Sequence, residues 1–280
     1  MTALGQTLIG RVPKPALSVA MVICAVIGFA ALFGPLIAPY DPIATNPASA
    51  LLSPSLAHPC GTDHVGRDIC SRIIVATRLD LFIGLSSAAL ALVVGGLIGA
   101  VGAYFGGWID RICVWIVDTI IAFPLFLLAM GIVAALGNSL VNVIYATAIV
   151  NIPFYARAMR AEILQRREAG FVEAARVAGN GRWRVLFVHL IPCAWPGLAV
   201  QASLTMGWAI LNAASLSFIG LGIRPPQPEW GLMVAEGASF IISGQWWVSL
   251  MPGIVLVSVV LFFNLLGDRL RDLLDIRERR

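Results

Sequence analysis

Four residues with metal-binding side chains lie close together in the sequence: His58, Cys60, His64 and Cys70. Imidazole and thiolate groups are common ligands of zinc and nickel in proteins. Their spacing matches no established ligand pattern, so we predict no metal site here. The two cysteines could instead pair in an oxidising compartment, and the sequence leaves that pairing open.

The sequence contains no motif for nucleotide hydrolysis or covalent catalysis. Its single lysine, Lys14, follows no glycine-rich loop, so a phosphate-binding loop of the GxxxxGK[ST] type is absent. HExxH, CxxC and GxSxG are absent as well. We therefore expect a protein that is not an enzyme and has no cofactor. If ATP drives its work, another chain must bind the ATP.

The composition is that of a membrane protein. Hydrophobic residues make up 59% of the chain and charged residues only 12%, against roughly 25% charged in a soluble domain. Six apolar stretches approach the roughly 20 residues that a membrane-spanning helix needs: 17–38, 81–105, 113–136, 140–156, 197–221 and 248–267. The runs are continuous rather than alternating, which favours helices over a β-barrel. We predict an all-α polytopic membrane protein with six transmembrane helices.

The basic residues predict the orientation of these helices. Placing both termini in the cytoplasm puts about 15 of the 19 Lys and Arg residues on the cytoplasmic side, as the positive-inside rule requires. The first stretch is too long for a signal peptide and lacks a cleavage site, so we expect it to be retained. The net charge of +4 then reflects orientation, and we expect no nucleic-acid partner.

Residues 171–179 predict a short helix outside the membrane. Small apolar side chains and one aromatic recur at helical spacing on one face: Phe171, Ala174, Ala175 and Ala178. Glu173 lies near the helix start, where the dipole favours a negative charge, and Gly179 suits a left-handed helix end. Such a face lets the groove of another protein approach closely, and arginines can contact its rim: Arg176, Arg182 and Arg184. The alternative, a helix lying on the lipid surface, has little apolar bulk to insert.

Ionisable and polar residues inside the spans are candidates for a transport pathway. Asp118 is the clearest, because it could line the path, contact a substrate amine or hydrogen-bond a neighbouring helix. Asn142, Gln201 and Asn212 are further candidates. Each of these three could equally connect two helices.

The stretch EAARVAGNGRWRVLFVHLIP resembles the EAA loop of ATP-binding-cassette (ABC) importer permeases. Glu173, Ala174, Ala175, Gly179 and Pro192 stand at the motif spacing. Three more stretches resemble the dipeptide, oligopeptide and nickel permease subfamily, in the shorter of its two permease types: GTDHVGRD with the following Ser-Arg at 61–72, LSFIGLGIRPPQPEWG at 216–231 and FNLLGDRLRDLLD at 263–275. Two positions of the loop, His189 and Ile191, depart from the usual motif, although a His resembles the peptide-importer branch.

The resemblance implies the fold of a type I ABC importer permease. Residues 1–80 would hold the cytoplasmic tail, the first helix and a periplasmic loop, and residues 81–280 the core permease domain with the EAA loop at about 170–192. A coupling helix in that loop would dock into a cytoplasmic ATPase through these residues: Phe171, Glu173, Ala174, Ala175, Gly179, Arg182 and Pro192. The external segments would dock a binding protein through another set: Asp63, Arg67, Asp68, Arg72, Glu229 and Trp230. Alternatively, the first four of that set pair with one another and hold the loop's shape.

The implied function is the permease subunit of an ATP-driven, binding-protein-dependent importer of di- or oligopeptides in the inner membrane. Its partners would be a homologous second permease, two cytoplasmic ATPase subunits, an external binding protein and membrane lipid. A nickel or metallophore importer is the alternative substrate class. A self-contained secondary transporter or channel is a different class, for which we would expect inverted repeats and broken midplane helices, and the sequence shows neither.

Overall fold

The computed structural model describes residues 14–278, and the side chains of residues 25–272. The N-terminal tail with Arg11, and the terminal Arg279 and Arg280, lie outside this range. The elements follow in chain order: α1 (Lys14–Ile37), the 3₁₀ turn η1 (Pro47–Ser49), α2 (Ile69–Phe105), α3 (Gly107–Ala122), α4 (Leu125–Leu136), α5 (Leu140–Arg166), α6 (Gly170–Val177), α7 (Arg182–Arg184), the π-helical stretch η2 (Val185–Leu190), α8 (Ile191–Phe218), α9 (Trp230–Ala238) and α10 (Trp247–Glu278).

The predicted all-α polytopic fold is confirmed. Within the described residues, four helical stretches are long and apolar enough to cross a membrane: α2, α5, the continuous run α7–η2–α8 and the Trp247–Asp272 part of α10. The pair α3 and α4 makes a fifth if it counts as one bent span, and α1 contributes a shorter described apolar part, Ala25–Ile37. Each of the six predicted apolar stretches therefore falls on a helix or a helix pair.

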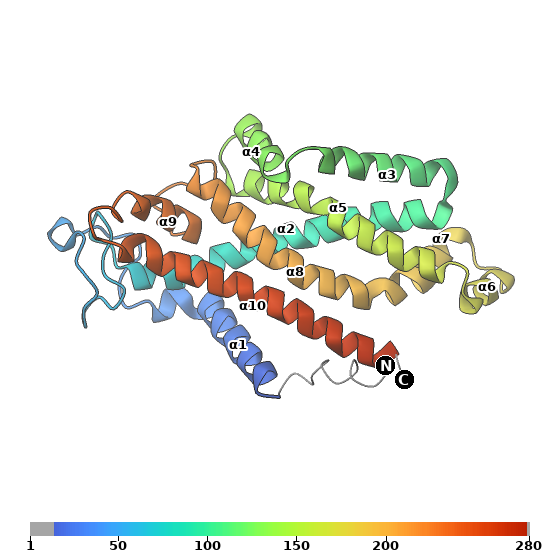
Figure 1. The fold of residues 1–280 in the computed structure, drawn as a ribbon, viewed down its shortest axis with the longest axis horizontal. Coiled ribbons are helices and arrows are strands. Elements are labelled where there is room, and N and C mark those ends of the chain that lie inside the picture. The colour runs from blue at the N-terminus through green and yellow to red at the C-terminus, as the bar shows by residue number, and fades with distance from the viewer. Residues whose placement is uncertain (1–13, 279–280) are drawn as a thin grey trace, which may run out of the picture.

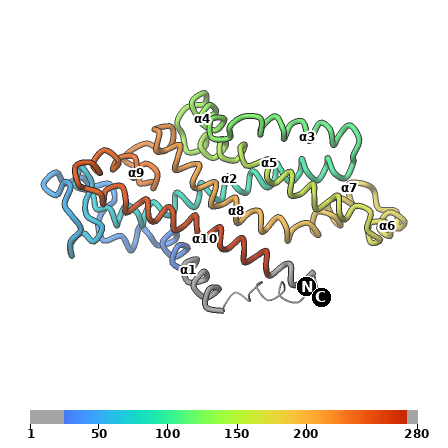
Figure 2. The backbone as a smooth tube through the Cα atoms, in the orientation of Figure 1, coloured from blue at the N-terminus to red at the C-terminus, as the bar shows by residue number. Residues whose placement is uncertain are grey.

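The third predicted span, 113–136, is not one continuous helix, and that prediction was wrong. The chain breaks between α3 and α4, whose axes are bent by 88° (Figure 2). The cause is Pro124, which disfavours helical geometry in the residue before it. Phe123 accordingly has extended backbone angles, φ −87° and ψ 145°.

The fourth predicted span, 140–156, is too short. Helix α5 continues through the buried Pro153 to Arg166. Helix α5 also packs closely on α2, at glycine residues of α2. A Cβ on Gly95 would lie 2.5 Å from the Ile152 carbonyl oxygen, and one on Gly99 would lie 2.2 Å from the Ala156 carbonyl oxygen. Only glycine lets the two backbones approach this closely.

The long helices run roughly along the long axis of the molecule, and different segments of the chain lie at its two ends. Figure 1 shows α6 at one end, and α9 with the 38–68 segment at the opposite end. We call these the α6 end and the α9 end. The largest apolar core lies toward the α6 end and joins side chains from α2, α5, α6, η2 and α8. A displacement of α6 therefore acts on several long helices at once.

Candidate functional site

Helix α6 is a single short helix with defined ends. Its N-cap, Ala169, makes no side-chain capping bond, and Glu173 lies in the first turn, where it complements the helix dipole. Past its C-terminal end, Gly179 has the predicted left-handed conformation, with φ +82°. The Gly179 N–H donates to the Arg176 carbonyl at 3.0 Å, and the Asn180 N–H donates to the Ala175 carbonyl at 3.2 Å. These bonds satisfy carbonyls that the helix end would otherwise leave unpaired.

The buried and exposed faces of α6 consist of different residues from those that the sequence predicted. Val172 and Ala175 are buried, whereas the exposed side chains of this segment are Phe171, Glu173, Ala174, Arg176, Val177 and Ala178. Ala175 therefore packs against the bundle and is not available to a partner, which corrects its predicted place on the exposed face. The sequence analysis missed Val172 as the second anchor, although its i, i+3 spacing to Ala175 was visible.

These two anchors connect α6 to the bundle core. Val172 and Ala175 belong to the same apolar cluster as Ile163 of α5, Leu186 of η2 and Ala103 of α2. A guanidinium N–H of Arg167, just after α5, donates to the Ala103 carbonyl at 3.1 Å. Because buried side chains pack at near-crystalline density, a push on α6 is transmitted to these helices rather than absorbed.

A polar cleft lies beside α6. It has a volume of about 410 Å³ and is lined by Tyr104, Phe105, Arg176, Asn180 and Arg182. The Arg176 guanidinium lies over the Tyr104 ring at 5.7 Å, and the Trp183 ring lies 4.8 Å from that of Phe105. The arginines expected at the rim, Arg176, Arg182 and Arg184, are exposed. Pro192 is exposed near the junction of η2 and α8.

The charged residues of the α9 end form a buried network. Arg67 donates from Nε to Asp63 Oδ2 at 2.6 Å and from Nη2 to Glu236 Oε2 at 3.1 Å. Arg72 donates from Nη2 to the same Glu236 oxygen at 3.2 Å, and its Nε lies 3.8 Å from Asp63 Oδ2. Asp63, Arg67 and Arg72 are each at most 5% exposed. The network joins the segment before α2 to α9, and the sequence analysis did not include Glu236.

The residues that suggested a metal site hold this same loop together. Cys60 and Cys70 form a disulfide, which settles the pairing that the sequence left open. His58 Nδ1 lies 2.9 Å from Asp68 Oδ1. The other Asp68 oxygen accepts the Ser71 N–H at 2.7 Å and so caps the start of α2.

Glu229 and Trp230 are fully buried as well. The Glu229 carboxylate caps α9 by accepting the Gly231 N–H at 2.8 Å and the Leu232 N–H at 2.7 Å. Burial raises the pKa of the Glu229 carboxyl, and the hydrogen bonds from these two backbone N–H groups oppose the rise. The Trp230 indole donates to the carbonyl of Ile73 in α2 at 3.2 Å.

All six residues predicted to dock a binding protein are therefore buried inside the chain. For Asp63, Arg67 and Arg72, the structure shows the alternative interpretation, in which they pair with one another. Asp68 instead contacts His58 and caps α2. The exposed surface at this end lies beside them, for example along residues 224–227.

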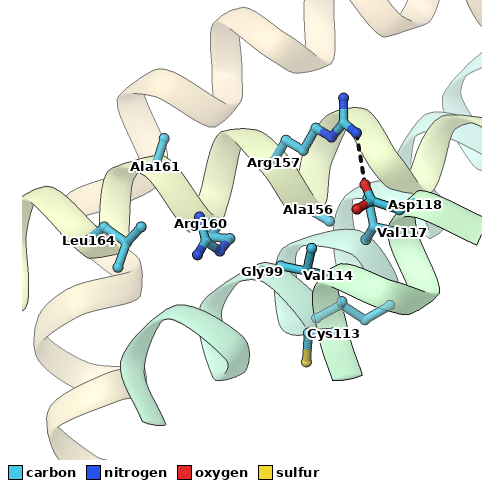
Figure 3. A pocket seen from close by; sticks show the side chains of 11 residues that line it. Gly99, Cys113, Val114, Val117, Asp118, Ala156, Arg157, Arg160, Ala161 and Leu164 are labelled. Carbon is cyan, nitrogen blue, oxygen red and sulfur yellow. Dashed lines mark hydrogen bonds and ion pairs between the residues drawn. The ribbon is translucent and has the colours of Figure 1, made fainter. Parts of the chain in front are cut away.

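Asp118 lies on α3 beside a cavity of about 350 Å³ between α2, α3 and α5 (Figure 3). Its Oδ1 accepts a hydrogen bond from Arg157 Nη2 at 2.9 Å. A second pair lies along the same two helices, where Arg160 donates from Nε and Nη2 to the two oxygens of Asp110 at 2.8 and 2.7 Å. The sequence analysis missed Arg157 and Arg160 as partners because it ended the fourth span at residue 156.

The other pathway candidates make local contacts. The Asn142 amide donates to the carbonyls of Leu136 and Gly137 at 2.9 and 2.8 Å, which joins the ends of α4 and α5. The Gln201 amide donates to Thr205 Oγ1 one turn further along α8 at 3.2 Å. Asn212 is half-buried on the same helix. The structure does not bring these three together with Asp118.

Residues 91–280 match the family described as "Binding-protein-dependent transport system inner membrane component". The chain belongs to this family. It is therefore an inner-membrane, multi-pass permease component of such a transport system. The match covers both the α6 segment and every membrane-crossing stretch after the first half of α2.

Several curated relatives cover most of the chain. It is 44% identical over 245 residues to the dipeptide transport system permease protein DppC of Alkalihalophilus pseudofirmus, covering 88% of this chain and 80% of that one. It is 43% identical to the probable D,D-dipeptide transport system permease protein DdpC of Escherichia coli, with 87% and 82% covered. The glutathione transport system permease protein GsiD of Pectobacterium atrosepticum is 42% identical, with 79% and 73% covered.

Solved structures share the fold of this permease. An inward-facing conformation of the MetNI methionine ABC transporter aligns with a TM-score of 0.59 at 20% identity, covering 72% of this chain and 95% of that one. An amino acid ABC transporter with histidines aligns with a TM-score of 0.53 at 18% identity, covering 74% and 94%. The predicted type I ABC importer permease fold is thereby confirmed.

Proposed function

We propose that this chain is the membrane-spanning permease subunit of an ATP-driven importer of di- or oligopeptides. It pairs with a homologous second permease, because six helices form only half of a closed pathway. Two cytoplasmic ATPase subunits and an external binding protein complete the importer. Both termini and the α6 end face the cytoplasm, and the α9 end faces the binding protein.

The observation that carries this proposal is the way α6 is built into the bundle. One face of α6 is exposed, while Val172 and Ala175 anchor the other face in a core shared with α2, α5 and α8. A helix of this kind can receive a push from a partner and pass it to the spans. ATP-driven closure of the ATPase pair would then shift the spans between two arrangements, and a bistable packing of this kind is what a switching interface requires.

The peptide substrate is supported by the names of the relatives. Three proteins at least 42% identical to this chain are named for dipeptide, D,D-dipeptide or glutathione transport. All of these solutes carry free carboxylates and an ammonium group. The alternative substrate class, nickel or metallophores, gains no support from the described residues, since the cysteines of the external loop are bonded to each other.

Reconstitution tests the proposal. The chain should co-purify with an ATPase subunit and its second permease. Proteoliposomes that contain the assembled importer should take up a labelled dipeptide only when ATP is supplied on the cytoplasmic side and the binding protein carries the dipeptide. Binding-protein titrations with dipeptides and with nickel complexes identify the substrate class. Uptake by the isolated chain under an ion gradient, without any ATPase, would contradict the proposal and point to a secondary transporter.

A further inference from the structure

The loop of residues 52–59, which we call the tip loop, carries an unusually exposed apolar side chain. Leu56 is 104% exposed, and no large apolar residue among residues 25–272 is more accessible. The other exposed residues of the tip loop are also uncharged: Leu52, Ser53, Ser55, Ala57 and Pro59. The chain has no Asp, Glu, Lys or Arg between Asp41 and Asp63. The tip loop is therefore an uncharged and partly apolar surface.

Membrane lipid does not explain the exposure of Leu56. Residues 38–68 form no helix except the three-residue turn η1, and irregular backbone of this kind does not face the hydrocarbon core. Figure 1 shows this segment reaching farther from α6 than α9 does. Leu56 therefore lies in water unless another protein covers it.

A second exposed apolar residue at the same end serves as a comparison. Ile242 is 96% exposed, but the adjacent Ile241 lines an apolar cavity with Trp246 and with Leu250 of α10. Because α10 is one of the membrane-crossing helices, this surface continues a face that lipid or a neighbouring span covers. Ile242 thus has an explanation that Leu56 lacks.

The tip loop is held firmly at its base. The Thr62 N–H donates to the Leu52 carbonyl at 3.0 Å, and the Leu52 N–H donates to Thr62 Oγ1 at 2.8 Å. The Tyr40 hydroxyl donates to the Ala57 carbonyl at 2.9 Å, and the disulfide described above ties the segment that follows the loop to the start of α2. A loop fixed in this way loses little conformational entropy when a partner binds it.

The partner of the tip loop lies outside the cytoplasm. The disulfide beside the loop forms and persists in an oxidising compartment, which places this end on the external side. The description of the family states its dependence on a binding protein, and in the importer proposed above that protein is the partner on the external side. An uncharged patch around one apolar anchor is typical of the centre of a protein–protein interface.

We propose that the tip loop docks the binding protein and that Leu56 inserts into an apolar pocket of that partner. This surface takes the place of the six residues that the sequence analysis expected to dock the binding protein and that the structure buries. The buried charges hold the segment in shape, and the tip loop makes the contact. The inference rests on the proposed importer function and names the contact surface for its external partner.

The test titrates dipeptide-loaded binding protein against the complete importer in nanodiscs and measures the stimulated ATP hydrolysis. Leu56→Ser should raise the binding-protein concentration for half-maximal stimulation about tenfold, the loss expected when one apolar anchor is truncated. The rate at saturating binding protein should stay within about twofold of the wild-type rate, because a substitution at an exposed position leaves the fold intact.

Two further variants make this titration specific. Leu56→Met retains the apolar bulk and should shift the half-maximal concentration much less than Leu56→Ser does. Ile242→Ser is the matched control, because it removes a similarly exposed apolar side chain at the same end, and it should not shift that concentration.

Each contrary outcome has a definite meaning. Equal half-maximal concentrations for Leu56→Ser and the wild type would overturn this inference alone. Loss of the second permease from the purified Leu56→Ser importer would show that the tip loop meets that subunit, and the inference would fail. If no binding protein stimulates the wild-type importer, the proposed function fails, whatever Leu56 contacts.

Photocrosslinking gives a second readout that does not depend on ATP hydrolysis. A benzophenone-bearing phenylalanine at position 56 should form a covalent adduct with the binding protein in the assembled importer, and the same residue at position 242 should not. An adduct from position 56 with the second permease, or equal adducts with the binding protein from both positions, would contradict the proposal.

Discussion

The two ends of this permease treat charge in opposite ways. At the α9 end, Asp63, Arg67 and Arg72 are buried and pair with one another and with Glu236. At the α6 end, Glu173, Arg182 and their neighbours are exposed around a helix that only two side chains anchor. A region that satisfies its own charges keeps its shape alone, whereas a region with exposed charges is completed by a partner. We infer that the α9 end serves stability, and we propose that the α6 end serves coupling.

The largest expected effect lies at the α9 end. Arg72→Met removes one of the two guanidinium groups from the buried network and leaves Asp63 and Glu236 with Arg67 alone, which should lower the free energy of unfolding by about 3 kcal/mol. Thermal unfolding of the purified protein in detergent measures it. Arg224→Met, in the exposed loop at the same end, is the control and should change the free energy by less than about 0.5 kcal/mol. Equal, small effects of both substitutions would show that the network does not hold this end together.

The next effect concerns coupling at the α6 end. Gly179 has φ +82° with open space around it, so Gly179→Asp strains the helix end by about 1 kcal/mol without a clash. Because α6 then meets its partner at the wrong angle, ATP-driven uptake should fall about tenfold while the protein stays in the membrane. Glu173→Lys should act in the same direction, because it reverses the charge at the helix start.

Gly181 offers a matched control for that prediction. It lies two residues away, also has open space, and has an ordinary φ of −64°. Gly181→Ala should therefore leave uptake within about twofold of the wild type. Loss of the protein from the membrane in Gly179→Asp, rather than loss of uptake, would mean that this turn serves folding and not coupling.

The smallest effect is a pH dependence at the α9 end. Burial raises the pKa of Glu229 above 4.5, so the folded protein binds this proton more tightly than the unfolded chain does. Stability from this group is therefore present at low pH and is lost as the pH rises from 4.5 through the raised pKa. Glu229→Gln removes the titrating carboxyl and should flatten this slope, whereas Glu168→Gln at the exposed α6 end should not. Melting temperatures across the pH range measure both slopes, and an unchanged slope in Glu229→Gln would exclude the Glu229 carboxyl as its source.

The sequence predicted the parts of this fold that depend on local chemistry. Continuous apolar runs predicted the spans, and Gly179 predicted the end of α6. These features follow from hydrophobicity and backbone freedom, which each residue carries with it. Whether a charged residue is buried or exposed depends instead on distant segments, and this is where the predictions diverged from the structure.

Three residues illustrate that limit. Ala175 has the same spacing signal as Ala174, and only the packing of α5 and η2 decides that it faces inward. Arg72 was placed on an exposed rim, because its partner Glu236 lies 164 positions further along the chain. Arg157 was treated as part of a loop, because Pro153 indicated a helix end where tertiary packing instead continues α5.

One measurement tests most directly the claim that the exposed face of α6 receives the ATPase. The measurement compares thiol crosslinking to the ATPase subunit, in the assembled importer, for three variants that each introduce one cysteine. They are Ala174→Cys on that exposed face, Val172→Cys on the buried face of α6 and Gln227→Cys at the exposed α9 end. Our account predicts a crosslink from position 174, none from 172 and none from 227, with the first one changing in yield when ATP binds. A crosslink from position 227, or none from 174 in an importer that is active, would contradict it.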